Sequence, residues 1–152
     1  MRRCVNESAS RVALGLYQVL DGTGASGDTK QKVAVARLQE STNNWPAAAA
    51  IYREVLQADG NSLLALRGLA NAEAAQGRTT EALALWATYT AKSRPGDLSW
   101  FRGQYEQARL LVASGDKQKS CDLLTKLRPS MPGLTDTDLR TQFNDLHKQA
   151  CG

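Results

Sequence analysis

The chain has 152 residues, a length that corresponds to one compact domain or one short repeat array and excludes two unrelated catalytic lobes. Its residues are 42% hydrophobic but only 6% aromatic, so the core must be built from small aliphatic side chains, which favours packed helices and disfavours a β-sandwich. A formal net charge of +4 is only mildly basic and argues against a dedicated nucleic-acid binder.

A first helix is predicted over about residues 6–20, and Gly22, Gly24 and Gly27 end it, because three glycines so close together disfavour any regular element. The basic residues before this helix resemble the start of a signal peptide, but polar residues stand where its apolar run should begin. We therefore expect no cleaved signal peptide within this sequence. No stretch approaches the roughly 18 apolar residues that cross a bilayer, so we expect a soluble chain without membrane insertion.

Helical periodicity continues along the chain, with no run of alternating β-branched residues that would indicate a strand. Asp28 and Gln31 have the spacing of a capping box and predict the start of a second helix, which ends near residues 43–44. Pro46 lies in the first turn of a third helix, where proline is tolerated. Further helices are predicted over about residues 62–76, 79–92, 98–114, 117–127 and 137–150, separated mainly by glycines and prolines.

The most specific feature of the sequence is an internal repeat with a period of 34 residues. Ala48 recurs as Ala82, and Tyr52 recurs as Trp86, both at this one shift. The small residue lets two antiparallel helices touch, and the aromatic residue one turn later fills the space beneath the neighbouring helix. A helical pair of this length and pattern resembles the tetratricopeptide repeat (TPR) family, over about residues 29–134.

A third copy of the repeat fits after a four-residue insertion, with Gly115 at the position of Gly77. It departs from the pattern because Ser120 stands where the alanine is expected and Leu124 where the aromatic residue is expected. The first helix of the chain can also be read as the second half of a preceding repeat. The chain would then be the C-terminal end of a longer protein, whereas the alternative is a dedicated N-terminal cap.

The last predicted helix has one apolar stripe on an otherwise polar surface, as expected of a helix that closes a repeat array; the stripe consists of Leu139, Phe143, Leu146 and Ala150. The predicted fold is all-α: a helical-hairpin repeat array, for which the resemblance implies a TPR-like right-handed superhelix, with a C-terminal capping helix. The predicted segments are an N-terminal helix with its Gly-rich turn (1–28), three repeats (29–62, 63–96 and the divergent 97–134) and the capping helix (135–152).

Groups that could carry catalysis are almost absent from the sequence. His147 is the single histidine, and no nucleophile stands at a recognisable spacing from it, so its helix face is most simply solvated. The glycines within residues 22–27 have the spacing of a dinucleotide fingerprint, but they follow a helix and not a strand. We therefore predict a protein that binds and does not catalyse, with no catalytic residue, no metal and no cofactor.

The TPR resemblance implies that the first helix of each pair lines a concave groove that accepts an extended peptide. The candidate groove residues are Lys30, Arg37, Arg67, Asn71, Arg102, Tyr105 and Arg109. Arg67 and Asn71 are four residues apart on one helix face and resemble one half of the Lys-and-Asn carboxylate clamp of some family members. The alternative is that these arginines are ordinary solvated charges, paired with Glu40, Glu73 and Glu106.

The leading interpretation is a protein-interaction scaffold that binds an extended or helical peptide, acidic if the basic groove is its site, while the partner's identity and the oligomeric state stay open. One alternative is a structural spacer or self-association module of a larger protein. Another is a weak nucleic-acid binder, for which the groove offers only Tyr105 as a stacking aromatic. Trp100 and Phe101 are either an exposed anchor for a partner or two rings packed under a turn.

Three cysteines, Cys4, Cys121 and Cys151, are too few and too scattered for a disulfide-rich scaffold or a zinc site. Cys121 and Cys151 lie at adjoining ends of the last two helices and could form a disulfide; the alternative is two reduced thiols. If the two helices form a simple hairpin about the connection near Gly133, the residue opposite Cys121 is close to His147 and not Cys151. Cys151 then lies about one turn, roughly 6 Å, too far along, so the last turn would have to unwind or shift for the bond to form. The compartment stays open: cytoplasm, or periplasm or cell exterior if the two cysteines are bonded.

Overall fold

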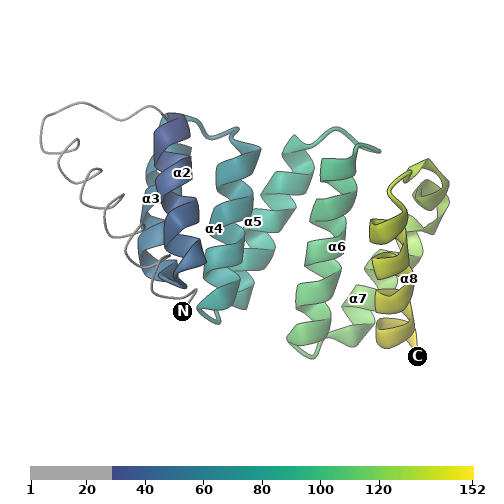
Figure 1. Cartoon of the computed structure of the whole chain (residues 1–152). Coiled ribbons are helices and arrows are strands. Elements are labelled where there is room, and N and C mark those ends of the chain that lie inside the picture. The colour runs from purple at the N-terminus through teal and green to yellow at the C-terminus, as the bar shows by residue number, and fades with distance from the viewer. Residues whose placement is uncertain (1–28) are drawn as a thin grey trace, which may run out of the picture. The chain divides into compact units, whose positions relative to one another are not determined.

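A computed structural model describes residues 29–152 of the chain (Figure 1). Within this part all regular structure is helical, as predicted from the sequence. The helices are α2 (Thr29–Ser41), α3 (Trp45–Ala58), α4 (Leu63–Ala75), α5 (Thr79–Lys92), α6 (Leu98–Ala113), α7 (Lys117–Leu127), the 3₁₀-helix η1 (Arg128–Gly133) and α8 (Thr137–Cys151). The predicted first helix, its Gly-rich turn, Asp28 and Cys4 lie outside the described residues.

The observed helices begin and end close to the predicted positions, because local side-chain chemistry sets their ends. The Ser62 side chain accepts a hydrogen bond from the backbone N–H of Ala65 at 3.3 Å, and Asp136 accepts one from Leu139 at 2.8 Å, so each residue caps the helix that follows it. Gly77 follows α4 with a φ of 77°, a left-handed conformation that glycine adopts without strain.

The chain forms two compact units, with the boundary after Arg78. The described part of the first unit contains α2, α3 and α4, and the second unit contains α5, α6, α7, η1 and α8. The boundary falls between the two helices of the predicted second repeat, 63–96. The division into three repeats and a cap stays a prediction, as does the right-handed superhelical sense.

In the first unit, α3 packs against both α2 and α4. Ala48 has no exposed surface and Tyr52 is buried, so the small residue and the aromatic residue of the predicted pattern both lie in the core. The Tyr52 ring lies directly against Gly68 of α4, where a Cβ atom would come within 2.2 Å of the ring. The same pattern holds for Ala82 and Trp86 of α5, which are also buried.

One carboxylate is buried among the helices of the first unit. Glu73 of α4 is only 3% exposed, and it forms ion pairs with Arg53 of α3 and with Arg78, the latter at 3.1 Å. The backbone N–H of Arg78 also donates to the Glu73 carbonyl at 2.9 Å. Because two cations compensate the buried charge, this arrangement fixes the end of α4 against α3.

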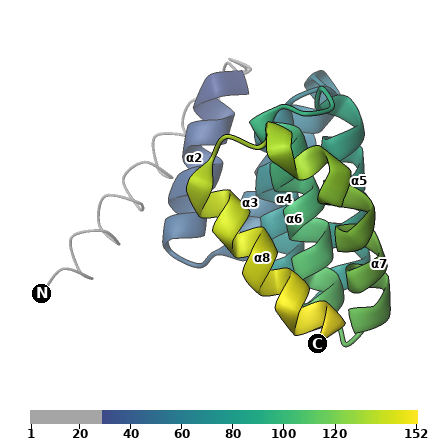
Figure 2. The same cartoon turned by 90° about the vertical axis from the view of Figure 1, so that its right-hand side faces the viewer.

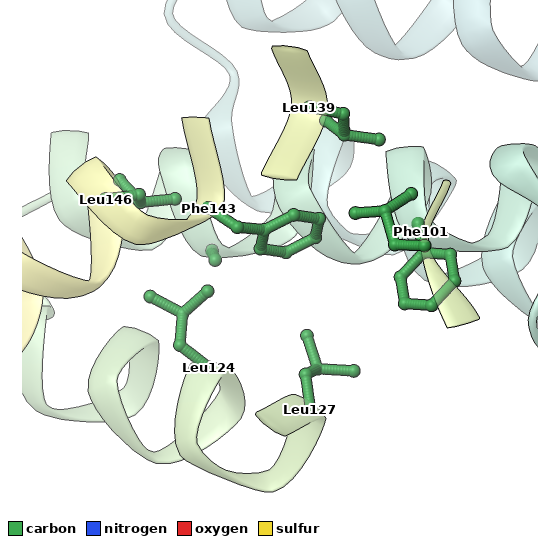
Figure 3. Packing of buried hydrophobic residues seen from close by; sticks show 8 residues of the cluster. Phe101, Leu124, Leu127, Leu139, Phe143 and Leu146 are labelled. Carbon is green, nitrogen blue, oxygen red and sulfur yellow. The ribbon is translucent and has the colours of Figure 1, made fainter. Parts of the chain in front are cut away.

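The core of the second unit joins α6, α7 and α8 (Figure 3). Phe143 of α8 meets Phe101 of α6 edge to face, with 6.4 Å between ring centroids, and both rings are buried. Leu124 and Leu127 of α7 face the same cluster. The burial of Phe101 confirms the packed alternative for that ring, while Trp100 is half-buried and stacks edge-on against it at 5.0 Å.

The two departures of the third repeat are accommodated by packing. The buried Ser120 hydroxyl donates to the Ala108 carbonyl at 2.9 Å, so a polar residue replaces the expected alanine without leaving its hydroxyl unsatisfied. Leu124 fills the place of the expected aromatic residue within the core.

Helices α5 and α6 approach each other closely, as α3 and α4 do at Gly68, because a Cβ atom at Gly103 would lie 2.2 Å from the Thr90 hydroxyl oxygen.

Helix α8 packs along α7 and also contacts α6 (Figure 2). A disulfide joins Cys121 to Cys151, with 5.1 Å between their Cα atoms. Helix α8 remains regular as far as Cys151, so the last turn does not unwind to make the bond. The sequence estimate was wrong in this respect, because it treated the connection as one simple turn, whereas residues Arg128–Gly133 form a 3₁₀-helix between α7 and α8.

We predict that Gly68→Ala destabilises the chain by about 1–3 kcal/mol, because the added methyl group would overlap the buried ring of Tyr52. Helix propensity alone would make the alanine variant more stable by about 1 kcal/mol. A measured loss of stability can therefore be attributed to the contact with the Tyr52 ring and not to propensity. Denaturant titration followed by circular dichroism measures the change. Gly60→Ala is the matched control in the same unit, because its Cβ would lie 3.7 Å from the nearest atom, the Leu56 carbonyl oxygen. Equal stability of Gly68→Ala and the parent would contradict the close contact.

We predict that replacing both Cys121 and Cys151 with serine lowers the free energy of unfolding by about 3–4 kcal/mol, since the bond closes a loop of 30 residues in the unfolded chain. Urea unfolding of the oxidised parent, the reduced parent and the double variant measures this difference. The reduced parent should behave like the double variant. An oxidised parent no more stable than the reduced one would show that the bond contributes nothing.

Candidate functional site

The residues predicted to line the groove divide between the two units. Those of the first unit lie on α2 and α4, and those of the second lie on α6. The first set is Lys30, Arg37, Arg67 and Asn71, and the second is Arg102, Tyr105 and Arg109. Each set is on the helix predicted for it, and a groove that runs through both sets stays a prediction.

In the first unit, Arg37 of α2 and Arg67 of α4 both act electrostatically on one carboxylate, that of Glu40. The hydroxyl of Tyr52, from α3, hydrogen-bonds to the same carboxylate. Three helices therefore bring two cations, one acid and one phenol together. We call these four residues the Glu40 cluster.

Burial raises the pKa of the Glu40 carboxyl, and the hydrogen bond from Tyr52 and the charges of Arg37 and Arg67 oppose that shift. The Oε1 atom of Glu40 is buried and has no hydrogen-bond partner among the described residues. Burial, followed by the neighbouring Glu40 charge, also raises the pKa of Tyr52, so its hydroxyl stays protonated and serves as a donor. The carboxylate is thus only partly satisfied, which makes its ionised form costly in the folded chain.

A hollow of about 280 Å³ lies between α2 and the start of α4, beside the Glu40 cluster. Its walls are partly apolar, and Leu64 at its edge is 49% exposed. Lys30 and Arg37 stand on the same wall of this hollow, so the structure brings these two predicted residues together. The lining residues are Thr29, Lys30, Val33, Ala34, Arg37, Ser62 and Leu64.

Arg67 is half-buried and Asn71, one turn later on α4, is exposed. Glu73 does not pair with Arg67, because its partners are Arg53 and Arg78. The alternative in which Glu73 neutralises a groove arginine is therefore wrong for this acid. The clamp-like role of Arg67 and Asn71 stays a prediction.

In the second unit, the predicted residues are partly occupied by contacts within the unit. Arg109 forms an ion pair with Glu106 at 2.7 Å, as the solvated-charge alternative expects. Tyr105 is half-buried, and its ring meets Phe143 of α8 edge to face at 5.4 Å. Burial, and then the charge of Glu106, raises the pKa of Tyr105. Tyr105 therefore contributes to the packing of α8 on α6, while Arg102 beside it is half-buried.

Sequence reasoning missed a second hollow, of about 400 Å³, which lies between α7, η1 and α8. His147 lines it and is half-buried, while the other polar residues of its helix face are exposed, as expected of a solvated face. The cause is tertiary: η1 and the end of α7 come to lie beside the His147 face of α8. No periodic signal in the sequence could have indicated this arrangement.

Within residues 29–152, no group of three or more His, Cys, Asp or Glu side chains could hold a metal ion. The helices of this part are also too short or too polar to cross a membrane.

No family model and no curated protein matches the chain. Among solved structures, the chain is similar to the type III secretion chaperone SycD of Yersinia enterocolitica, in complex with a peptide of the translocator YopD. The sequence identity is 15% and the TM-score is 0.69, over 83% of this chain and 95% of that chain. At this identity the likeness shows the fold, which is all-helical and TPR-like.

We predict that Glu40→Gln reduces the pH dependence of stability. The ordinary pKa of the carboxyl is 4.5 and the folded value is higher, so Glu40 favours the folded state below pH 4.5 and loses that contribution as pH rises through the folded pKa. The parent should therefore lose stability relative to Glu40→Gln between pH 4 and pH 7, as measured by urea unfolding. Glu81→Gln, at an exposed position of α5, is the control and should show no such change. A difference between parent and Glu40→Gln that is the same at both pH values would contradict the burial of this carboxyl.

Proposed function

We propose that this protein is a member of the TPR family that acts as a non-catalytic scaffold and binds an acidic, extended or helical peptide. The observation that carries the proposal is the basic surface of α2 and α4: the exposed Lys30 and Arg37 line one hollow, and the charges of Arg37 and Arg67 both act on the Glu40 carboxylate. Two arginines are near one acid in the Glu40 cluster, so the cluster keeps a net positive charge. The TPR-like fold and the peptide complex of the structural neighbour support the same function.

The surroundings of the Glu40 cluster suit a peptide. Lys30 and Asn71 are exposed on the same two helices, and Leu64 offers an apolar contact in the hollow that Lys30 also lines. A peptide carboxylate would gain charge-assisted hydrogen bonds from the basic residues, and an apolar side chain would gain contact area on Leu64. Anionic peptides with interspersed apolar residues should therefore bind best.

We predict that the double variant Arg67→Ala, Asn71→Ala weakens binding of an acidic peptide by on the order of tenfold, about 1.4 kcal/mol, without unfolding the chain. Fluorescence anisotropy with a labelled acidic peptide and its lysine-substituted counterpart measures both affinity and charge preference. Affinity should fall as salt rises, because exposed charges are screened over about 10 Å at 0.1 M. Lys126→Ala, which removes an exposed charge from α7, is the control.

Several results would contradict this function. Binding that persists in the double variant and in high salt would exclude the basic cluster as the site. A concentration-dependent dimer in light scattering, without peptide binding, would favour the self-association module. Salt-sensitive retention on RNA together with no peptide affinity would favour the nucleic-acid binder.

We also propose that the chain works in an oxidising compartment, such as a periplasm or the cell exterior, because disulfides persist there and are rare in the cytosol. The bond between Cys121 and Cys151 supports this location. With three cysteines in the sequence, thiol titration of the denatured, unreduced protein purified from its source should find one free thiol per chain. Three free thiols would contradict the bond and remove the support for this compartment.

A further inference from the structure

The hollow between α7, η1 and α8 has the chemistry of a binding site that the proposed peptide groove does not use. Its volume of about 400 Å³ falls within the range of ordinary ligand sites, about 300–1,000 Å³. We call it the C-terminal hollow. It is lined by Leu124, Arg128, Met131, Phe143, Asn144, His147 and Lys148.

Apolar and basic groups share the lining of the C-terminal hollow. Leu124 and Phe143 belong to the buried core of the second unit, and Met131 is half-buried against it (Figure 3). Arg128, His147 and Lys148 supply the basic groups, and no acidic side chain lines the hollow. A site of this kind favours a carboxylate that is attached to a bulky apolar group.

The basic groups retain charge that is available to a ligand. Arg128 is exposed; its backbone N–H donates to the Thr125 carbonyl, but its guanidinium makes no hydrogen bond or ion pair within the described part. Lys148 has one acidic neighbour, Asp145, at 3.6 Å on its own helix, and its side chain remains 79% exposed. The Arg128 side chain therefore gives the hollow a positive charge that no acidic side chain of the described part pairs with.

The walls of the hollow are held in place before anything binds. The Cys121–Cys151 bond ties the start of α7 to the end of α8, and the two prolines of η1 restrict the backbone between them. Because the walls are already ordered, binding of a ligand loses less conformational entropy than it would if the walls had to become ordered on binding.

From these observations we infer that the C-terminal hollow is a second binding site, for a partner peptide segment that carries a carboxylate side chain beside a bulky apolar one. Arg128 and Lys148 contact the carboxylate, and the apolar side chain lies on Met131 and Phe143. This site is separate from the Glu40 cluster, and it does not depend on the function proposed for that cluster.

The single histidine of the chain provides a direct readout, because the NMR signal of the His147 imidazole reports occupancy of the hollow. The probe is an octapeptide with a Leu-Phe-Glu-Glu centre, titrated into the tag-free, oxidised Arg67→Ala, Asn71→Ala variant. The double change weakens the proposed groove, so a shift of the His147 signal in that background reports the hollow, and its absence would count against the hollow alone. We expect a saturable shift of the His147 signal, and no shift with the peptide that carries lysine in place of glutamate.

In the same background, Arg128→Gln should weaken the affinity by on the order of tenfold. Lys126→Gln is the matched control, because it removes the same charge from the adjoining turn without touching the hollow, and it should leave the affinity unchanged. Urea unfolding should show that both variants retain the parent's stability. Equal affinity of Arg128→Gln and Lys126→Gln, or an unmoved His147 signal, would overturn the inference.

Two further outcomes identify a different occupant and would also overturn the peptide assignment. Competition by free phenylpropionate at the same affinity as the peptide would show a small organic acid as the occupant. A His147 signal that shifts with protein concentration in the absence of peptide would show that a second copy of the chain covers the hollow.

Discussion

Close approach between helices, at residues with almost no side chain, is the constraint on which the rest of the structure depends. The ring of Tyr52 lies on the bare backbone of Gly68, and Thr90 lies on that of Gly103. Larger residues at these two positions would separate the helices and expose the core. Because the core is built from small aliphatic side chains, it buries little apolar area, and any loss of that area is costly. The Glu40 cluster exists only because α2, α3 and α4 come this close, since each helix supplies at least one of its members.

The all-α class and the helix ends could be predicted because they depend on local chemistry. Glycines such as Gly77, the helix start near residue 62, and the 34-residue recurrence of Ala48 and Tyr52 can all be identified from the sequence. The 3₁₀-helix η1 could not be predicted in this way. Two nearby prolines predict only that the α-helix ends there. The conformation of the backbone between α7 and α8 depends on how these two helices pack against each other.

The candidate sites were likewise predictable where they depend on spacing within one helix, and not where they depend on tertiary packing. Residues on one helix face, such as Arg67 and Asn71, follow from spacing alone, but which acid pairs with which base does not. The pairing of Glu73 with Arg53 and Arg78 could not be predicted, because Arg53 is distant in sequence and Arg78 lies beyond the end of the helix. The C-terminal hollow was missed for the same reason, since its lining comes from three elements.

The bond between Cys121 and Cys151 changes how the second unit responds to tension. A pull on the C-terminal end of the chain reaches α7 through the two sulfur atoms, because they join positions 30 residues apart. Most of α7, all of η1 and nearly all of α8 are then shielded from the load. The chain cannot lengthen by the roughly 100 Å that this segment would span when extended at about 3.4 Å per residue. Under oxidising conditions, unravelling from this end is therefore stopped at its first turn.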